Sequence, residues 1–150
     1  MKCYFDNSAT TKCLDEVVDK MNEMMRDTYG NPSSLHNMGF DAEKELNNAR
    51  QIIAKSLKAN DKEIVFTSGG TESNNLALIG SALANRRAGK HIITSGIEHP
   101  SINEPLKFLE EEGYEVTYLP VDENGLVSLD ALRDSIRDDT ILVSIMHINN

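Results

Sequence analysis

Three groups of residues in this chain carry side chains or backbone groups suited to chemistry. Residues 68–71 (Ser-Gly-Gly-Thr) place glycines and a hydroxyl at the start of an expected helix. Unpaired N–H groups at a helix start, together with the positive end of the helix dipole, favour a phosphate group. His99 offers a flat ring for stacking on a heteroaromatic cofactor and a nitrogen that moves protons near neutral pH. Asn149 and Asn150 offer amides that can orient an oxygen of a bound ring.

Each of these groups also has a purely structural interpretation. A serine or threonine at this point caps a helix equally well, a loop histidine can bond a backbone carbonyl, and asparagine favours turns. The glycine segment is neither a dinucleotide-binding fingerprint nor a Walker loop, because the six-residue glycine spacing and the Gly-Lys-Ser/Thr ending are missing. The residues by themselves therefore leave both interpretations open at each position.

The elements that must position these groups alternate between strand and helix. Strands are expected at residues 63–67, 91–95, 114–119 and 140–147, and helices at residues 71–87, 100–112 and 129–136. This alternation predicts an α/β fold with a mostly parallel sheet and flanking helices. Ligands of such sheets bind beyond the carboxyl ends of the strands, where we expect the three groups to meet.

Two helices are expected before the sheet, over residues 15–29 and 39–57, with a Gly-Asn-Pro breaker between them. We expect the methionines of the first helix and the apolar residues of the second to pack in a core. The predicted organisation is an amino-terminal helical segment and loop over residues 1–60, followed by the first part of an α/β domain over residues 61–150. The last, strongly apolar strand has no helix after it, so we expect the chain to be truncated.

Length and charge exclude several functions. A chain of 150 residues suits one domain or part of one. Its net charge of −9 is spread along the chain, which disfavours nucleic-acid partners. No apolar run approaches the roughly 20 residues that cross a membrane, and the start resembles no secretory signal, so we expect a cytoplasmic protein. Cys3 and Cys13 are too few for a disulfide scaffold, and the histidines lack metal-ligand spacing.

Taken together, the motifs resemble the amino-terminal part of cysteine desulfurases, class V aminotransferase-like enzymes of pyridoxal 5'-phosphate (PLP) fold-type I. The resemblance covers nearly the whole chain, and the Asn-Pro-Ser-Ser loop favours the iron–sulfur-assembly branch. It rests on residues 4–11 (Tyr-Phe-Asp-Asn-Ser-Ala-Thr-Thr), 30–34 (Gly-Asn-Pro-Ser-Ser) with His36 and Gly39, 63–74 (Glu-Ile-Val-Phe-Thr-Ser-Gly-Gly-Thr-Glu-Ser-Asn), 98–99 (Glu-His) and 143–150 (Val-Ser-Ile-Met-His-Ile-Asn-Asn).

The resemblance implies PLP as cofactor and an incomplete fold-type I large domain. Gly70 and Thr71 would hold the PLP phosphate, His99 would stack on the pyridine ring and transfer protons, and Asn150 would bond the phenolic oxygen of the ring. Enzymes of this family convert L-cysteine to L-alanine and pass the sulfur to an enzyme cysteine as a persulfide. No lysine of the chain suits the site. The PLP-binding lysine, the aspartate at the pyridine nitrogen, the substrate arginine and the nucleophilic cysteine are expected beyond residue 150, so the chain alone should be inactive.

Two alternatives stay open at this point. One is another class V PLP enzyme, such as an aminotransferase or a different lyase, and the other is a non-catalytic interaction module. The resemblance also implies a homodimer and a partner that is an iron–sulfur scaffold or another sulfur acceptor. Neither a nucleic acid nor a membrane is expected as a partner.

Overall fold

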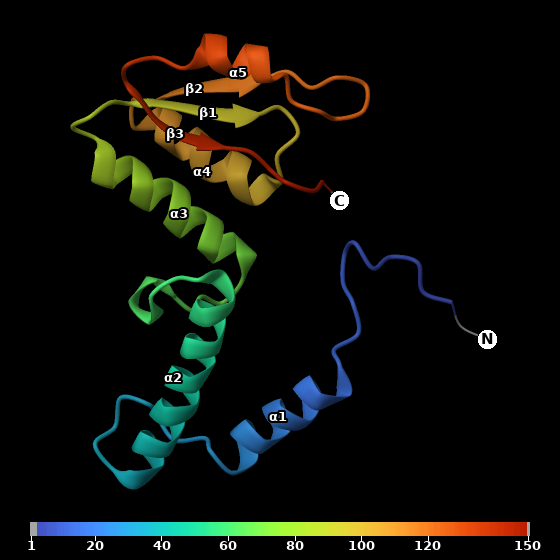
Figure 1. The fold of residues 1–150 in the computed structure, drawn as a ribbon, viewed down its shortest axis with the longest axis vertical. Coiled ribbons are helices and arrows are strands. Elements are labelled where there is room, and N and C mark those ends of the chain that lie inside the picture. The colour runs from blue at the N-terminus through green and yellow to red at the C-terminus, as the bar shows by residue number, and fades with distance from the viewer. Residues whose placement is uncertain (1–2, 150) are drawn as a thin grey trace. The chain divides into compact units, whose positions relative to one another are not determined.

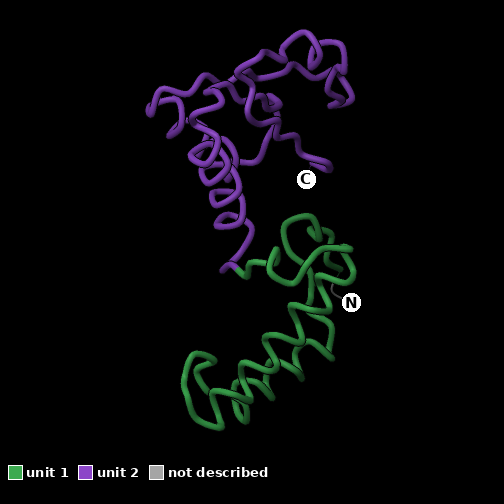
Figure 2. Tube along the Cα trace, turned by 60° about the vertical axis from the view of Figure 1, so that its left-hand side comes forward, with its two compact units in different colours: residues 1–66 green, residues 67–150 purple. Residues whose placement is uncertain are grey.

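The structure is a computed structural model that describes residues 3–149 (Figure 1). The chain divides between Phe66 and Thr67 into two compact units (Figure 2). The predicted domain boundary at residue 60 lies a few residues before this division. No helix of the described chain is both long enough and apolar enough to cross a membrane.

The first unit is helical. Helix α1 spans Asp15–Arg26, helix α2 spans Asn37–Leu57 and a short 3-10 helix, η1, spans Asp61–Glu63. Acidic residues in the first turn of α1 and a basic residue in its last turn complement the helix dipole. The His36 ring caps α2, because its Nδ1 accepts a hydrogen bond from the N–H of Gly39 at 3.2 Å.

The prediction that the apolar residues of these two helices pack in a core is wrong for the described chain. Helix α1 buries none of its residues, and Met21 and Met25 are 54% and 64% exposed. Helix α2 buries three small residues, Gly39, Ala42 and Ala54, whereas several of its large apolar side chains, such as Phe40 and Ile52, stay largely exposed. An amphipathic helix buries its apolar face only where a second surface covers it, and periodicity alone does not reveal that surface.

The second unit alternates strands and helices around a parallel sheet. Strands β1 (His91–Ser95), β2 (Glu115–Leu119) and β3 (Thr140–Ser144) alternate with helices α3 (Gly70–Asn85), α4 (Pro100–Glu111) and α5 (Leu129–Ser135). The strands are parallel and lie in the order β2-β1-β3. Figure 1 shows α3 and α4 on one side of the sheet and α5 on the other. The predicted α/β class with a parallel sheet is therefore confirmed.

The core of this unit lies between the sheet and the helix pair α3 and α4. Strand β1 is buried along its whole length because it lies between β2 and β3 and helices cover both faces of the sheet (Figure 1). The buried cluster consists of Leu78, Ala82, Ile92, Ile102, Leu106, Leu109 and Tyr114. The Tyr114 hydroxyl donates a hydrogen bond to the carbonyl of Ala82 at 3.0 Å, which satisfies a polar group inside this cluster.

Two strand predictions need correction. The strand predicted at residues 63–67 is wrong, because Glu63 ends η1 and residues 64–67 pair with no strand of the described chain. The strand predicted at residues 140–147 ends at Ser144. A strand requires a neighbour that pairs with its N–H and C=O groups, and that neighbour is set by tertiary structure rather than by local sequence.

Candidate active site

An open cavity of about 520 Å³ lies at the carboxyl edge of the parallel sheet. It is formed by the start of α3, the loop after β1, the start of α4 and the segment after β3. The lining residues are Gly70, Thr71, Asn74, Glu98, His99, Ser101, Ile102, Ser144, Ile145 and Met146. Its volume falls within the range of roughly 300–1,000 Å³ that is usual for small-molecule sites, and its location is the one expected for ligands of open parallel sheets.

The start of α3 presents free backbone donors to this cavity. No side chain of the described residues caps this helix. The backbone hydrogen bonds of the helix begin with the one from the Ser73 N–H to the Gly69 carbonyl, at 3.1 Å. The N–H groups of Gly70 and Thr71 therefore have no partner within the helix. A Cβ added at Gly70 would meet no atom within 4 Å. Free donors beside open space are the chemistry that a phosphate group requires.

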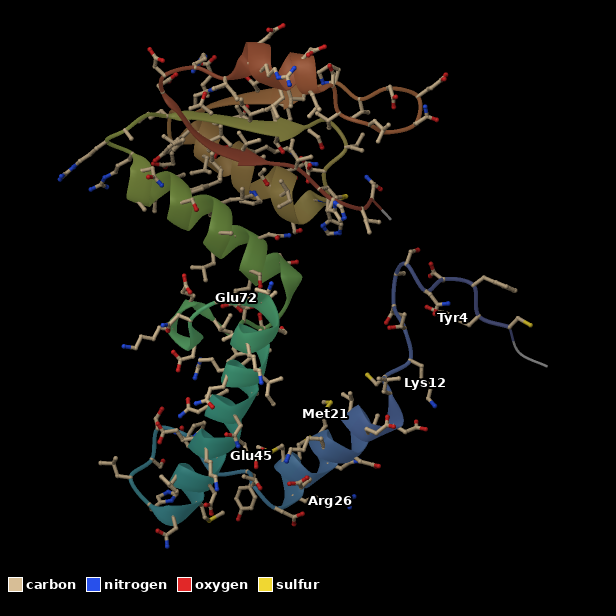
Figure 3. The ribbon with its side chains drawn as sticks, viewed as in Figure 1. Tyr4, Lys12, Met21, Arg26, Glu45 and Glu72 are labelled. Carbon is tan, nitrogen blue, oxygen red and sulfur yellow. The ribbon has the colours of Figure 1, made fainter. Side chains whose placement is uncertain are left out.

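A carboxylate shapes the turn that leads into α3. Glu72, labelled in Figure 3, accepts hydrogen bonds at Oε2 from the Ser68 hydroxyl and from the Ser68 N–H, each at 2.6 Å. The hydroxyl, and next the amide, lower the pKa of Glu72 below its ordinary value of 4.5. Both bonds turn the carboxylate back along the chain and hold the segment that precedes Gly70.

His99 lies at the start of α4 and is fixed through one ring nitrogen. Its Nδ1 accepts a hydrogen bond from the Ser101 N–H at 3.1 Å and lies 2.8 Å from the Ser101 hydroxyl oxygen. That oxygen in turn accepts a hydrogen bond from Asn74 Nδ2 at 2.9 Å, which joins α3 to α4. The other ring nitrogen, Nε2, has no hydrogen-bond partner among residues 3–149.

The loops on the other side of the cavity are also cross-linked. Glu98 is 7% exposed, and its Oε1 accepts hydrogen bonds from the Ser95 hydroxyl at 2.5 Å and from the Met146 N–H at 2.8 Å. Asn149 Nδ2 donates to the carbonyl of Ile97 at 2.8 Å. The segment after β3 is therefore held against the loop after β1.

The structure brings three of the predicted site residues together. Gly70, Thr71 and His99 all line the cavity, although they come from two different helix starts. Asn150 lies outside the described residues, so its expected role stays a prediction. None of the described lysines lines the cavity.

Asn74 and Ser101 are polar residues of the site that the sequence analysis did not single out. They are 27 residues apart, and each lies within the first turns of an ordinary amphipathic helix. No local spacing connects them, because their contact depends on how α3 packs against α4. The only available signal was the position of each residue close to a predicted helix start at the sheet edge.

Comparisons with known proteins give consistent similarities. The chain matches the family model of class-V aminotransferases over residues 3–150. It is 54% identical over 147 residues to the cysteine desulfurase IscS of Methanosarcina thermophila. This alignment covers 98% of this chain and 36% of that protein. Among solved structures, a NifS-like protein superposes with a TM-score of 0.95 at 43% identity, covering 99% of this chain and 41% of the other. SspA in complex with cysteine superposes with a TM-score of 0.86 at 42% identity, covering 97% and 42%. The chain thus spans 36–42% of the length of these relatives.

Proposed function

This chain belongs to the class-V aminotransferase family, and we propose that it is the amino-terminal part of a PLP-dependent cysteine desulfurase. The proposed reaction converts L-cysteine to L-alanine and passes the sulfur to an enzyme cysteine as a persulfide. The observation that carries the proposal is a cavity that is lined by both the uncapped start of α3 and His99. The similarity to IscS and to SspA, which was solved in complex with cysteine, supports cysteine as the substrate.

The residues present fit PLP, the cofactor of class-V aminotransferases and of their cysteine desulfurase relatives. The free N–H groups at Gly70 and Thr71 suit its phosphate, and the open space beside Gly70 admits a phosphate oxygen. The cavity volume of about 520 Å³ is sufficient for a small aromatic cofactor. When bound, PLP withdraws electrons from the Cα of an amino-acid substrate.

The proposed roles of the chain's own residues follow from their chemistry. Gly70 and Thr71 bind the phosphate through backbone N–H groups, and the Thr71 hydroxyl adds a further donor. His99 packs its ring against the cofactor ring and transfers a proton at Nε2, the ring nitrogen that has no hydrogen-bond partner among the described residues. Asn150 donates from its amide to the phenolic oxygen of the cofactor. The lysine that attaches PLP and the cysteine that receives sulfur would lie in the remainder of the protein.

The proposal also covers where the protein acts, its oligomeric state and the partners that receive its sulfur. A desulfurase of this kind would act as a cytoplasmic homodimer and supply sulfur for iron–sulfur clusters and thio-cofactors through a scaffold or another acceptor protein. The similarity to several proteins named IscS supports this setting. The acidic net charge of −9 in this chain favours partners other than nucleic acids.

The decisive experiment supplies the full-length protein with PLP, L-cysteine and a reductant, and measures alanine and sulfide. We expect both products without any added keto acid, whereas an aminotransferase would require a keto acid as amino acceptor. The His99→Gln variant should retain PLP, and its kcat should be about 100-fold or more lower, the usual contribution of a general acid or base. Asn85→Ala, at the far end of α3, is the control and should change neither the binding of PLP nor kcat. Absence of alanine, or full kcat in His99→Gln, would refute the proposal.

A further inference from the structure

The hydrogen bonds around His99 distinguish its two ring nitrogens. A backbone N–H can only donate, so the Ser101 N–H at 3.1 Å requires a lone pair on His99 Nδ1. A proton on Nδ1 would point at that N–H and lose the bond. The neutral ring compatible with this geometry therefore carries its proton on Nε2.

The Ser101 hydroxyl reinforces this preference. Its oxygen lies 2.8 Å from His99 Nδ1 and accepts a hydrogen bond from Asn74 Nδ2 at 2.9 Å. Because Nδ1 already presents a lone pair to the Ser101 N–H, the hydroxyl must be the donor in this contact, and its oxygen accepts from Asn74. Ser101 is only 9% exposed, so water competes little for its hydroxyl.

We propose that Asn74 and Ser101 are positioning residues that hold His99 in its Nε2-protonated form, with Nε2 as the ring nitrogen available to a ligand in the cavity. The value of this arrangement for catalysis rests on the proposed function, whereas the tautomer itself does not. Asn74 acts through Ser101, and Ser101 acts through the ring. Neither residue needs to touch substrate, since the effect is exerted on the proton of His99.

The test is ring ¹⁵N NMR of the full-length protein labelled at histidine, first without cofactor and then with PLP. His99→Gln identifies the His99 signals. We expect Nδ1 of His99 to show the shift of an unprotonated, hydrogen-bonded nitrogen and Nε2 to show that of a protonated one. Ser101→Ala should move the Nε2 signal downfield, toward an unprotonated nitrogen. It should also lower the ratio of the Nε2-protonated to the Nδ1-protonated form by about fivefold, the effect of one net hydrogen bond.

Substitution of Asn74 tests the second link of the chain. Asn74→Asp provides only acceptors, so it should draw the Ser101 proton away from His99 and reproduce the downfield shift of Ser101→Ala. Ser101→Thr keeps the hydroxyl and should restore the parent signal. Asn85→Asp adds the same charge to an exposed position of α3 and should leave His99 unchanged.

The outcomes separate this proposal from the proposed function. A protonated Nδ1 in the parent protein, or an Nε2 signal unaffected by both Ser101→Ala and Asn74→Asp, would overturn the positioning role. The expected signals in a protein that releases no alanine from cysteine would support the positioning role and refute the desulfurase proposal. With activity present, Ser101→Ala should lower kcat in proportion to the lost Nε2-protonated population, by at most about fivefold, while leaving the affinity for PLP unchanged.

Discussion

Glu98 and Met146 connect two loops that are 48 residues apart in the chain, through a hydrogen bond of 2.8 Å from the Met146 N–H to Glu98 Oε1. The same oxygen accepts the hydroxyl of Ser95, the last residue of β1. The end of the central strand and the segment after β3 are thus held by one buried carboxylate. Met146 lines the same cavity as the start of α3.

Removing this carboxylate should destabilise the protein. Glu98→Ala leaves the Ser95 hydroxyl and the Met146 N–H without their acceptor, and we expect the free energy of unfolding to fall by about 2 kcal/mol. Urea unfolding measures this change. Glu104→Ala removes an exposed carboxylate that forms a surface ion pair with Lys107 and should cost no more than about 0.5 kcal/mol. Equal losses in the two variants would contradict the structural role of Glu98.

The turn before α3 should be sensitive to acid. Because hydrogen bonds from Ser68 lower the pKa of Glu72 in the folded state, its contribution is fully present above the ordinary pKa of 4.5. It is lost as the pH falls through the lowered folded-state pKa, where the carboxylate is protonated. We expect Glu72→Gln to reduce the dependence of unfolding free energy on pH in this acid range. Exposed Glu111→Gln is the control, and an identical pH dependence in parent and Glu72→Gln would exclude this role.

Two helical glycines should respond oppositely to alanine. A Cβ at Gly39 in α2 would overlap the backbone carbonyl of Ser34, whereas a Cβ at Gly80 in α3 meets nothing within 4 Å. Gly39→Ala should therefore lower the free energy of unfolding by roughly 1–3 kcal/mol. Gly80→Ala should raise it by about 0.5–1 kcal/mol, because alanine restricts the unfolded chain and favours the helix. Thermal unfolding of both variants tests the pair, and a stabilising Gly39→Ala would show that the loop packs differently.

Leu106, in the core between the sheet and helices α3 and α4, should contribute more to the free energy of unfolding than a leucine at the protein surface. Leu106 is fully buried, and we expect Leu106→Ala to cost about 3 kcal/mol of unfolding free energy. Leu83 on α3 is 50% exposed, so Leu83→Ala should cost less than about 1 kcal/mol in the described arrangement. If Leu83→Ala costs as much as Leu106→Ala in the full-length protein, then a surface outside residues 3–149 covers this face of α3.

Local sequence determined the helices and the class of the second unit. The helix predicted at residues 100–112 is observed as Pro100–Glu111, because proline at its first position and glycine just after its end act within one turn of the chain. Gly70, Thr71 and His99 were identified for the same reason, since a helix start and a strand end are local features. The alternation of strands and helices then implied that these residues meet at one edge of a parallel sheet.

Tertiary structure decided which surfaces are paired and which polar groups meet. The extended segment at residues 64–67 has strand-like composition but no strand beside it in the described chain, and Met21 has helical periodicity but no covering surface. The Asn74–Ser101 bond likewise depends on how two helices pack, which no spacing along the chain records. Caps and breakers act over a few residues and can be identified in sequence, whereas burial, strand pairing and the Asn74–Ser101 hydrogen bond depend on partners that only folding brings within reach.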